Sequence, residues 1–282
     1  MAFEKAVRES VYQAELGKGT TEILGAAGLR LSGLGSFHLD EGPDFAWLNI
    51  YRTLADGRQL EITREREPLE VSLEDEAVIV RWATCESVGG SLSARYTINP
   101  DDSSVDVVFS AELEQDYRLF ELFIANYFTP YFTPRYAIKD NRTHPDGVFW
   151  YEKKWYVEFE NESWARDSAA EAIFADGRWT DGHALNWRRG PEYAYPLMTP
   201  QHRHGLAGAQ GAIILMARPE DCYGISGYNS YHNSQYFHLW GRDVMAGERI
   251  DIPVRMVLLT EWDDLGDAAL AAYHSWTEAV SQ

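Results

Sequence analysis

Histidines and aromatic residues are concentrated in one stretch near the C-terminus, residues 230–248, which read SYHNSQYFHLWGRDVMAGE. An imidazole exchanges protons near neutral pH, and an aromatic ring stacks on the apolar face of a sugar. The stretch has the pattern of a β-strand, in which alternate residues share a face, so we expect His232, His238 and Trp240 to point the same way. His238 and His232 are therefore candidate catalytic acid–base groups and Trp240 is a candidate stacking ring. The alternative is that the histidines are structural.

The distance between the two histidines limits what they can do together. His232 and His238 are six residues apart, which is roughly 20 Å on a straight strand at about 3.3 Å per residue. They are not expected to hold one metal ion or one sugar atom unless the chain turns at Asn233 or Ser234.

Two carboxylates in the middle of the chain are further candidates for acid–base chemistry. Glu158 and Glu160 alternate with Val157 and Phe159 on an expected strand, which places both carboxylates on one face about 7 Å apart. Carboxylates at that distance can divide the acid and base roles if one of them is desolvated. The alternative is an ordinary pair of solvent-facing strand residues.

A loop-like segment, residues 176–195, combines aromatic rings with arginines. A guanidinium binds a carboxylate at two points, and a neighbouring ring stacks on the C–H face of a sugar. The combination suits an acidic sugar such as a uronate, and the alternative is a surface loop whose rings pin it to the fold. The candidate substrate-binding residues are Arg178, Trp179, Trp187, Arg188 and Tyr193, together with Tyr228 and Trp240 further along the chain.

One pair of histidines has a spacing that suits a metal ion. His202 and His204 lie at positions i and i+2, close enough on a strand to share one metal, with His183 or His232 as a third ligand. The alternative is a solvent-exposed hairpin tip. We expect no required cofactor, because the sequence has no phosphate-binding loop, dinucleotide fingerprint, HExxH or GxSxG motif. Binding of a divalent metal ion stays an open alternative.

Composition narrows the choice of partners. The chain has 44 acidic and 25 basic residues, a formal net charge of -19, and 13% aromatic residues. Such a charge repels nucleic acid and anionic membranes, so the expected partner is a small-molecule sugar or oligosaccharide. The sequence shows neither a signal peptide nor a run of 18 apolar residues, so a cytoplasmic location is expected. The oligomeric state stays open.

Most of the chain alternates between apolar and polar residues, with turns rich in Gly, Pro, Asn and Asp between the runs. Residues 162–177 instead predict a short helix with Ser168 as its N-cap, and the tail after residue 262 predicts an amphipathic helix. The predicted fold class is all-β, a large antiparallel two-sheet sandwich formed by a single domain over residues 1–282. The expected strands are 28–34, 45–53, 60–64, 69–73, 77–85, 92–98, 105–112, 211–217, 222–226, 235–240 and 249–260.

The C-terminal run YFHLWGRDVMAGERIDIPVRMVLL resembles the closing segment of galactose-mutarotase-like proteins. In that family an aromatic-rich strand leads to an Ala-Gly-Glu type of turn, here residues 246–248, and then to a long final strand, here residues 249–259. The motif itself covers about the last quarter of the chain. Over the rest of the chain the resemblance lies in the spacing of the expected strands. It implies a β-supersandwich whose concave sheet face holds a carbohydrate, as in aldose epimerases, polysaccharide lyases and accessory domains of glycoside hydrolases.

The resemblance and the candidate residues together give three functional hypotheses. The first is a sugar or uronate epimerase or lyase that works by proton transfer at His238 or His232. The family's mid-chain histidine motif is absent from this sequence, which argues against a plain aldose 1-epimerase. The second hypothesis is a non-catalytic carbohydrate-binding or structural sandwich. The third is a metal-dependent sugar-modifying enzyme that uses His202 and His204.

Overall fold

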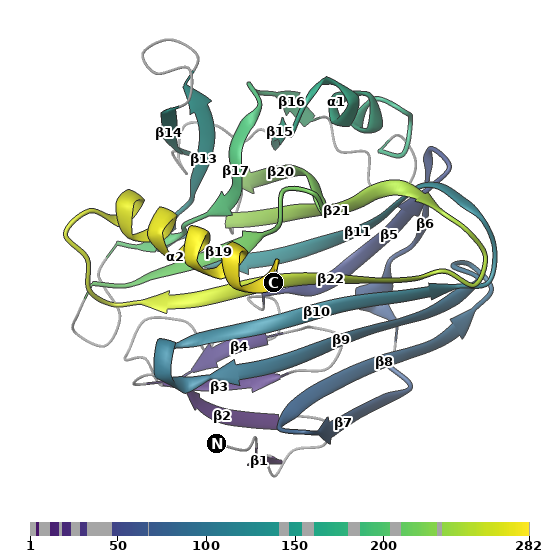
Figure 1. The fold of residues 1–282 in the computed structure, drawn as a ribbon, viewed down its shortest axis with the longest axis horizontal. Coiled ribbons are helices and arrows are strands. Elements are labelled where there is room, and N and C mark those ends of the chain that lie inside the picture. The colour runs from purple at the N-terminus through teal and green to yellow at the C-terminus, as the bar shows by residue number, and fades with distance from the viewer. Residues whose placement is uncertain are drawn as a thin grey trace.

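Three mainly antiparallel sheets make up most of the described part of the molecule in the computed structural model (Figure 1). The structure describes residues 4–5, 12–16, 19–23, 29–32, 47–66, 68–140, 147–153, 161–179, 187–203, 210–229 and 233–281. Of the four ranges before residue 47, and of Trp187 and Asn229, it describes the backbone alone.

The largest sheet has eleven strands, and neighbours in it pair antiparallel. Its short strands β12 (Phe132–Thr133) and β18 (Gln201–His202) pair with each other, and β18 also pairs with β19. The order of the other nine strands is β14 (Gly147–Glu152), β13 (Arg135–Asp140), β17 (Tyr193–Met198), β19 (Ala212–Ala217), β22 (Arg249–Leu259), β10 (Ser104–Leu113), β9 (Gly90–Asn99), β8 (Ala77–Cys85) and β7 (Glu70–Glu74).

Two smaller sheets complete the fold. The four-stranded sheet is β1 (Glu4–Lys5), β2 (Tyr12–Leu16), β3 (Gly19–Ile23) and β4 (Leu29–Ser32). The seven-stranded sheet has the order β16 (Trp187–Arg189), β15 (Asn161–Ala165), β20 (Cys222–Asn229), β21 (Asn233–Val244), β11 (Tyr117–Phe128), β5 (Asn49–Ala55) and β6 (Arg58–Glu61), with only β15 and β16 parallel.

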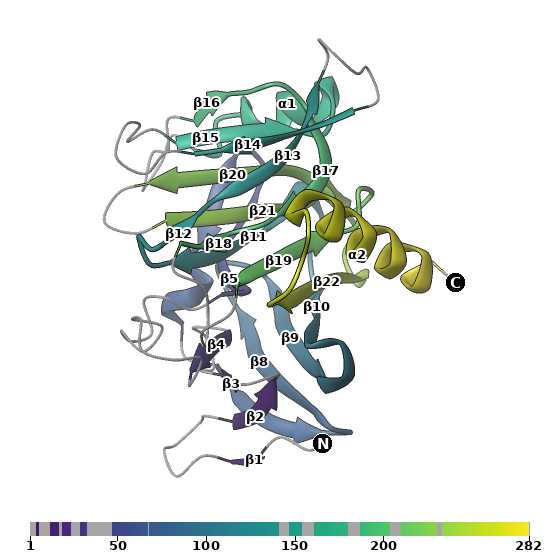
Figure 2. The same cartoon turned by 90° about the vertical axis from the view of Figure 1, so that its left-hand side faces the viewer.

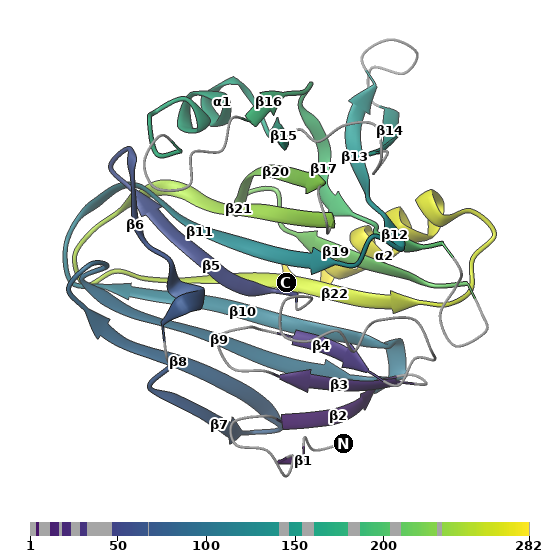
Figure 3. The ribbon, with the colours of Figure 1, turned by 180° about the vertical axis from the view of Figure 1, so that it is seen from behind.

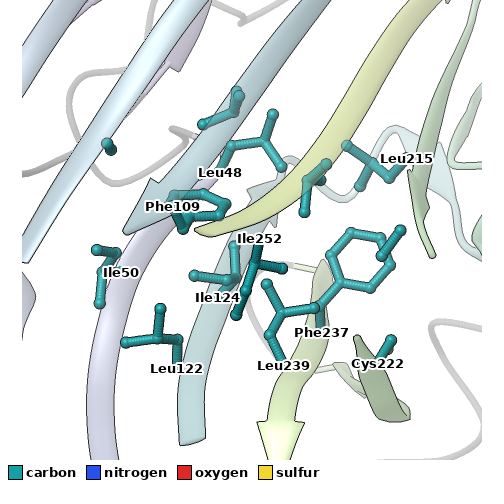
Figure 4. Close-up of a cluster of buried hydrophobic side chains, with 14 of the residues drawn as sticks. Leu48, Ile50, Phe109, Leu122, Ile124, Leu215, Cys222, Phe237, Leu239 and Ile252 are labelled. Carbon is teal, nitrogen blue, oxygen red and sulfur yellow. The ribbon is translucent and has the colours of Figure 1, made fainter. Parts of the chain in front are cut away.

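The main core lies between the seven-stranded and eleven-stranded sheets. Strand β9 alternates strictly between buried and half-buried residues, as expected of a strand with one face on the core. Leu122 and Ile124 of β11, Phe237 and Leu239 of β21, and Ile252 of β22 are all fully buried in this layer (Figure 4). The predicted all-β sandwich is therefore confirmed.

A C-terminal helix, α2 (Leu265–Val280), covers part of the outer face of the eleven-stranded sheet (Figures 1 and 2). Its buried residues Ala269, Tyr273 and Trp276 pack against apolar side chains of β13, β17 and β19. The four-stranded sheet lies on the opposite side of the eleven-stranded sheet from α2 (Figure 2). In the part of the chain that the structure describes, neither α-helix has the length and apolar content to cross a membrane.

A second helix, α1 (Ser168–Phe174), lies at one edge of the seven-stranded sheet beside β15 and β16 (Figure 3). Phe174 packs on Tyr223 of β20, and both belong to the apolar cluster on the outer face of the seven-stranded sheet, the face that points away from the eleven-stranded sheet. A helix is present within the predicted range 162–177, but the first residues of that range belong to β15. The N-cap of the helix is Asp167, not Ser168, because the Asp167 carboxylate accepts the Ala170 N–H at 2.8 Å.

The final hairpin follows the prediction at its turn but not along its first strand. Gly247 has φ 81°, a conformation that favours glycine, in the predicted turn before β22. Trp240 also has a positive φ, 77°, next to an irregularity in the pairing of β21 with β11. As a result Trp240 packs against the core between the sheets, while His238 points to the outer face. The prediction that His238 and Trp240 share a face is wrong.

Candidate functional site

One group of side chains on the outer face of the seven-stranded sheet combines tyrosine rings with guanidinium groups. We call it the tyrosine–arginine face; its members are Tyr51 and Arg52 on β5, Arg64 on the 3-10 turn Thr63–Glu65, Tyr127 on β11 and Tyr236 on β21. A β-bulge in β5 pairs Phe123 with Arg52 but Ile124 with Ile50. This extra residue lets both Tyr51 and Arg52 reach the outer face.

The members of the tyrosine–arginine face are in contact with one another. The Arg52 guanidinium lies 4.7 Å from the centre of the Tyr51 ring, and the Arg64 guanidinium lies 4.8 Å from that of Tyr127. The Tyr127 ring meets the rings of Tyr51 and Tyr236 edge-on, at centroid distances of 6.1 and 6.3 Å. Such pairings hold cations against ring faces and fix the direction of each guanidinium.

Exposure is uneven across this face. Tyr51 and Arg64 are half-buried, as is the neighbouring Tyr228, whereas Arg52, Tyr127 and Tyr236 are buried. Burial raises the pKa of both Tyr127 and Tyr236 well above the ordinary value, so their phenols keep their protons at neutral pH. Tyr51 and Arg64, the half-buried members, are therefore the ones that could offer a ring, a hydroxyl and positive charge to a ligand.

Beside this face lies a fully buried polar network centred on Glu121 and His238. The Nδ1 atom of His238 is 2.7 Å from Oε1 of Glu121, and its Nε2 atom is 2.7 Å from Oγ of Ser226. All three side chains are inaccessible to solvent. Rings of Phe123, at a centroid distance of 4.8 Å, and Phe174, at 4.6 Å, pack on the imidazole.

Burial lowers the pKa of His238, although its hydrogen bond with Glu121 acts in the opposite direction. Burial would raise the pKa of Glu121, but the hydrogen bond with His238 and the positive charge of Arg178 outweigh it and hold that pKa below its usual range. Glu121 is therefore ionised and His238 neutral. Since a carboxylate only accepts hydrogen bonds, Nδ1 of His238 donates to Glu121 and Nε2 accepts from Ser226.

This order of groups, hydroxyl to imidazole to carboxylate, is one that can activate a hydroxyl as a nucleophile or pass a proton. Ser226, His238 and Glu121 come from the adjacent strands β20, β21 and β11. Because each is enclosed by protein, the chemistry is available to a ligand only if the side chains above His238 move.

Arg178 and Trp179, predicted to bind substrate, are both buried next to this network. Arg178 donates from Nη1 to Oε2 of Glu121 at 2.8 Å and from Nη2 to the Leu119 carbonyl at 3.0 Å. The Trp179 ring packs edge-on against Phe123 at 4.9 Å. Arg178 thus contacts a carboxylate of the protein itself.

The remaining predicted substrate-binding residues are spread over the molecule. Tyr193 is buried in the core, where its hydroxyl donates to the Cys222 carbonyl. Arg188, on β16, has a 60% exposed side chain with its Nη1 3.6 Å from Glu162. Tyr228 adjoins the tyrosine–arginine face, and Trp240 is turned away from it. Of Trp187 only the backbone, on β16, is described.

Several candidate residues lie outside the described part of the chain, namely Glu158, Glu160, His183, His204 and His232. His202 is described: it is buried on β18, with its ring 5.0 Å from that of Phe132. Among the described residues, no three of the types His, Cys, Asp and Glu gather closely enough to hold a metal ion.

The sequence analysis did not select Tyr51, Arg52, Arg64, Glu121 or Ser226. A signal for two of them exists, because Arg52 and Glu121 are charged residues inside the strongly apolar stretches LNIYRTLA and LFELFIANYF. A charge in such a strand has to find a partner when it is buried.

Comparison with known proteins identifies the fold. No protein-family model and no curated protein sequence matches this chain. The GH36 alpha-galactosidase AgaB from Geobacillus stearothermophilus aligns with 93% of this chain and 41% of its own, at a TM-score of 0.50 and 9% identity. The alpha-N-acetylgalactosaminidase NagBb from Bifidobacterium bifidum aligns with 95% of this chain and 39% of its own, at a TM-score of 0.52 and 13% identity. Protein Slr1438 from Synechocystis aligns with 92% of this chain and 100% of its own, at a TM-score of 0.52 and 10% identity.

This chain therefore spans about two fifths of the length of the two glycosidases and the whole length of Slr1438. At these identities the likeness concerns the fold alone. The expected galactose-mutarotase-like fold is confirmed.

Proposed function

We propose that this protein binds carbohydrate on the tyrosine–arginine face, with an acidic sugar as the preferred ligand. The observation that carries the proposal is the gathering of tyrosine rings and two guanidinium groups on one sheet face, with Tyr51 and Arg64 half-exposed at its surface. Two of the solved structures that share the fold are named as an alpha-galactosidase and an alpha-N-acetylgalactosaminidase, which supports a sugar as the ligand class.

Each part of an acidic sugar has a matching group on this face. The half-buried ring of Tyr51 suits the C–H surface of a pyranose, and its hydroxyl suits a sugar hydroxyl group. The guanidinium of the half-buried Arg64 suits a carboxylate, because its planar fork donates two parallel hydrogen bonds, and the buried Arg52 adds positive charge beside Tyr51. The formal net charge of -19 works against acidic ligands at long range, so this local pair of cations determines the preference at the face.

Isothermal titration calorimetry with tri-galacturonate and with the neutral galactotriose tests the proposal. We expect the uronate to bind more tightly, and Arg64→Gln to weaken the uronate about tenfold while changing galactotriose much less. Asp106→Asn, which removes an ion pair with Arg255 from the other sheet, is the matched control and should leave both affinities unchanged. Equal binding of both sugars would remove the acidic preference, and binding of neither would overturn the proposal.

Proton-transfer chemistry at His238, as in an epimerase or lyase, is the second candidate function. The hydrogen-bonded order Ser226, His238, Glu121 favours it. This function requires that the side chains of Phe174 and Trp179 open to admit a sugar. Proton NMR of sugar panels in D₂O would detect exchange at a sugar C–H, and ultraviolet absorbance would detect an unsaturated uronate. Turnover that disappears in His238→Gln supports this candidate, and no turnover by the wild type leaves binding alone.

A further inference from the structure

We propose that the buried Glu121–Arg178 ion pair is a positioning device for the tyrosine–arginine face: it fixes Trp179 against Arg52 and thereby sets the affinity of the face for its ligand. The inference rests on the proposed function, since it assigns the residues that hold the binding face in shape. Neither Glu121 nor Arg178 would contact the ligand, because both are fully buried.

Arg178 anchors the segment that follows α1. Its Nε donates to Oδ1 of Asp176 at 3.0 Å, and its backbone N–H donates to the same atom at 3.0 Å. Its Nη1 and Nη2 atoms reach across to Glu121 and to the Leu119 carbonyl on β11. The guanidinium therefore fixes both the shape of this segment and its position over the sheet.

Glu121 is itself held firmly in place, so it can serve as a fixed anchor. Its Oε2 accepts from the Tyr223 hydroxyl at 2.6 Å as well as from Arg178, and its Oε1 accepts from Nδ1 of His238 at 2.7 Å. Leu119, whose carbonyl receives the other arm of Arg178, has a positive φ of 51° at an irregularity of β11. This local departure from regular strand geometry accompanies a carbonyl that is directed toward Arg178.

Trp179, the next residue, connects the ion pair to the binding face. Its ring packs edge-on against Phe123 at 4.9 Å and against His238 at 5.6 Å. The Arg52 guanidinium lies 5.9 Å from the centre of the Trp179 ring and 4.7 Å from that of Tyr51. Arg52 therefore lies against the Trp179 ring as well as the half-exposed Tyr51, and a displaced Trp179 would remove one aromatic support of Arg52.

A double-mutant cycle separates positioning from a purely structural role. With tri-galacturonate as the probe, we expect Glu121→Gln and Trp179→Ala each to raise Kd about tenfold, and the double variant to raise it about tenfold rather than about a hundredfold. This non-additivity is expected because the ion pair acts through the indole ring. Additive effects would overturn the inference, since a general loss of order does not depend on Trp179.

A spectroscopic readout reports on the ring directly. In protein labelled with 5-fluorotryptophan, the ¹⁹F resonance that disappears in Trp179→Phe belongs to Trp179. We expect this resonance to shift or broaden in Glu121→Gln and to stay in place in Asp106→Asn, which removes a carboxylate from the other sheet. An unchanged resonance in Glu121→Gln would overturn the inference.

A conservative variant keeps the test informative if Glu121→Gln does not fold. Arg178→Lys keeps the positive charge but loses the fork that bridges Glu121, Asp176 and Leu119, and it should move the Trp179 resonance and weaken the probe. If tri-galacturonate does not bind the wild type, the proposed function and the statement on affinity both fail. The ¹⁹F response then decides separately whether the ion pair positions Trp179.

Discussion

The two large sheets have different outer faces, although both consist of strands with the same alternation of inward and outward side chains. On the eleven-stranded sheet, Arg81 of β8, Ser93 of β9, Ser110 of β10 and Asp251 of β22 form one cross-strand row. Arg81, Ser93 and Ser110 line a groove of about 460 Å³. On the seven-stranded sheet, the corresponding face carries tyrosines, arginines and a buried histidine, His238, that packs against Phe174 of α1.

The ion pairs on the two faces differ in their exposure to solvent. On the eleven-stranded sheet, Arg249 pairs with Asp251, and their side chains are 60% and 49% exposed. Water screens such a pair, so it contributes little to stability. On the seven-stranded sheet, Glu121 and Arg178 are fully buried and depend on each other. The comparison indicates that the first face keeps its charges in contact with solvent and that the second encloses them in the protein.

Removing a carboxylate from the buried network should give the largest effect. We expect Glu121→Ala to lower the free energy of unfolding by about 3–5 kcal/mol, because Arg178 is left as a buried charge with one partner fewer. Asp106→Ala on the other sheet should cost less than about 1 kcal/mol, since its pair with Arg255 is partly exposed. Urea denaturation measures both values. Similar losses for the two variants would contradict the comparison of the faces.

A pair of serines gives a smaller contrast of the same kind. Ser226→Ala leaves Nε2 of the buried His238 without its hydroxyl donor. We therefore expect the free energy of unfolding to fall by about 1–3 kcal/mol. Ser110→Ala removes a hydroxyl that donates to Asp251, whose half-exposed carboxylate can turn to water instead. The free energy of unfolding of Ser110→Ala should therefore fall by less than about 1 kcal/mol. Thermal and urea unfolding of both variants would show the difference, and equal losses would count against it.

The pH dependence of stability should come from the buried face. The folded-state pKa values of His238 and Glu121 are both lowered, so the folded state binds fewer protons than the unfolded state. Their stabilising contribution is complete above the ordinary pKa of His238, 6.5, and is lost as the pH falls through the lowered pKa. One such proton changes stability by at most about 1.4 kcal/mol per pH unit.

His238→Gln tests this assignment. We expect the wild type to lose stability more steeply than this variant between pH 7 and pH 5 in urea titrations, because the variant lacks the buried imidazole. The other groups that face position 238, namely Glu121, Arg178, Arg189 and Tyr223, are unchanged in sequence between the two proteins. Identical slopes for the two proteins would show that other groups take up the protons.

The smallest effect is expected on the solvated face. Arg249→Gln removes an exposed ion pair with Asp251, and we expect its free energy of unfolding to stay within about 0.5 kcal/mol of the wild type. It should also leave sugar affinity unchanged, because β22 belongs to the other sheet. A measurable loss of sugar affinity in this variant would point to the groove of the eleven-stranded sheet as the binding surface.

Local pattern was enough to predict both helices and half of the described strands, whereas β11 and β13 to β17 were not predicted. Residues 77–85 form β8 as predicted, and β10, β19 and β22 lie within a residue or two of their expected ranges. Period-two burial and turn residues act over a few neighbours, so the sequence carries this information directly. The β-bulges at Trp240 and in β5 were not predicted, because no local pattern shows where one strand holds an extra residue against its partner.

The candidate site was predicted only in part. The sequence pointed to His238, Arg178 and Trp179, and the structure brings all three into one cluster. It could not show that the cluster is buried, or that Glu121 and Ser226 complete it from strands more than 100 residues apart.

The sequence by itself determined an acidic, aromatic-rich, all-β protein with a closing strand, turn and strand of the galactose-mutarotase-like kind. Only the tertiary structure decided which residues share a face, because pairing between β5, β11 and β21 joins Tyr51, Tyr127 and Tyr236 across nearly 200 positions. Only burial decided which charges pair with each other. Both depend on contacts between distant segments, which no window of sequence contains.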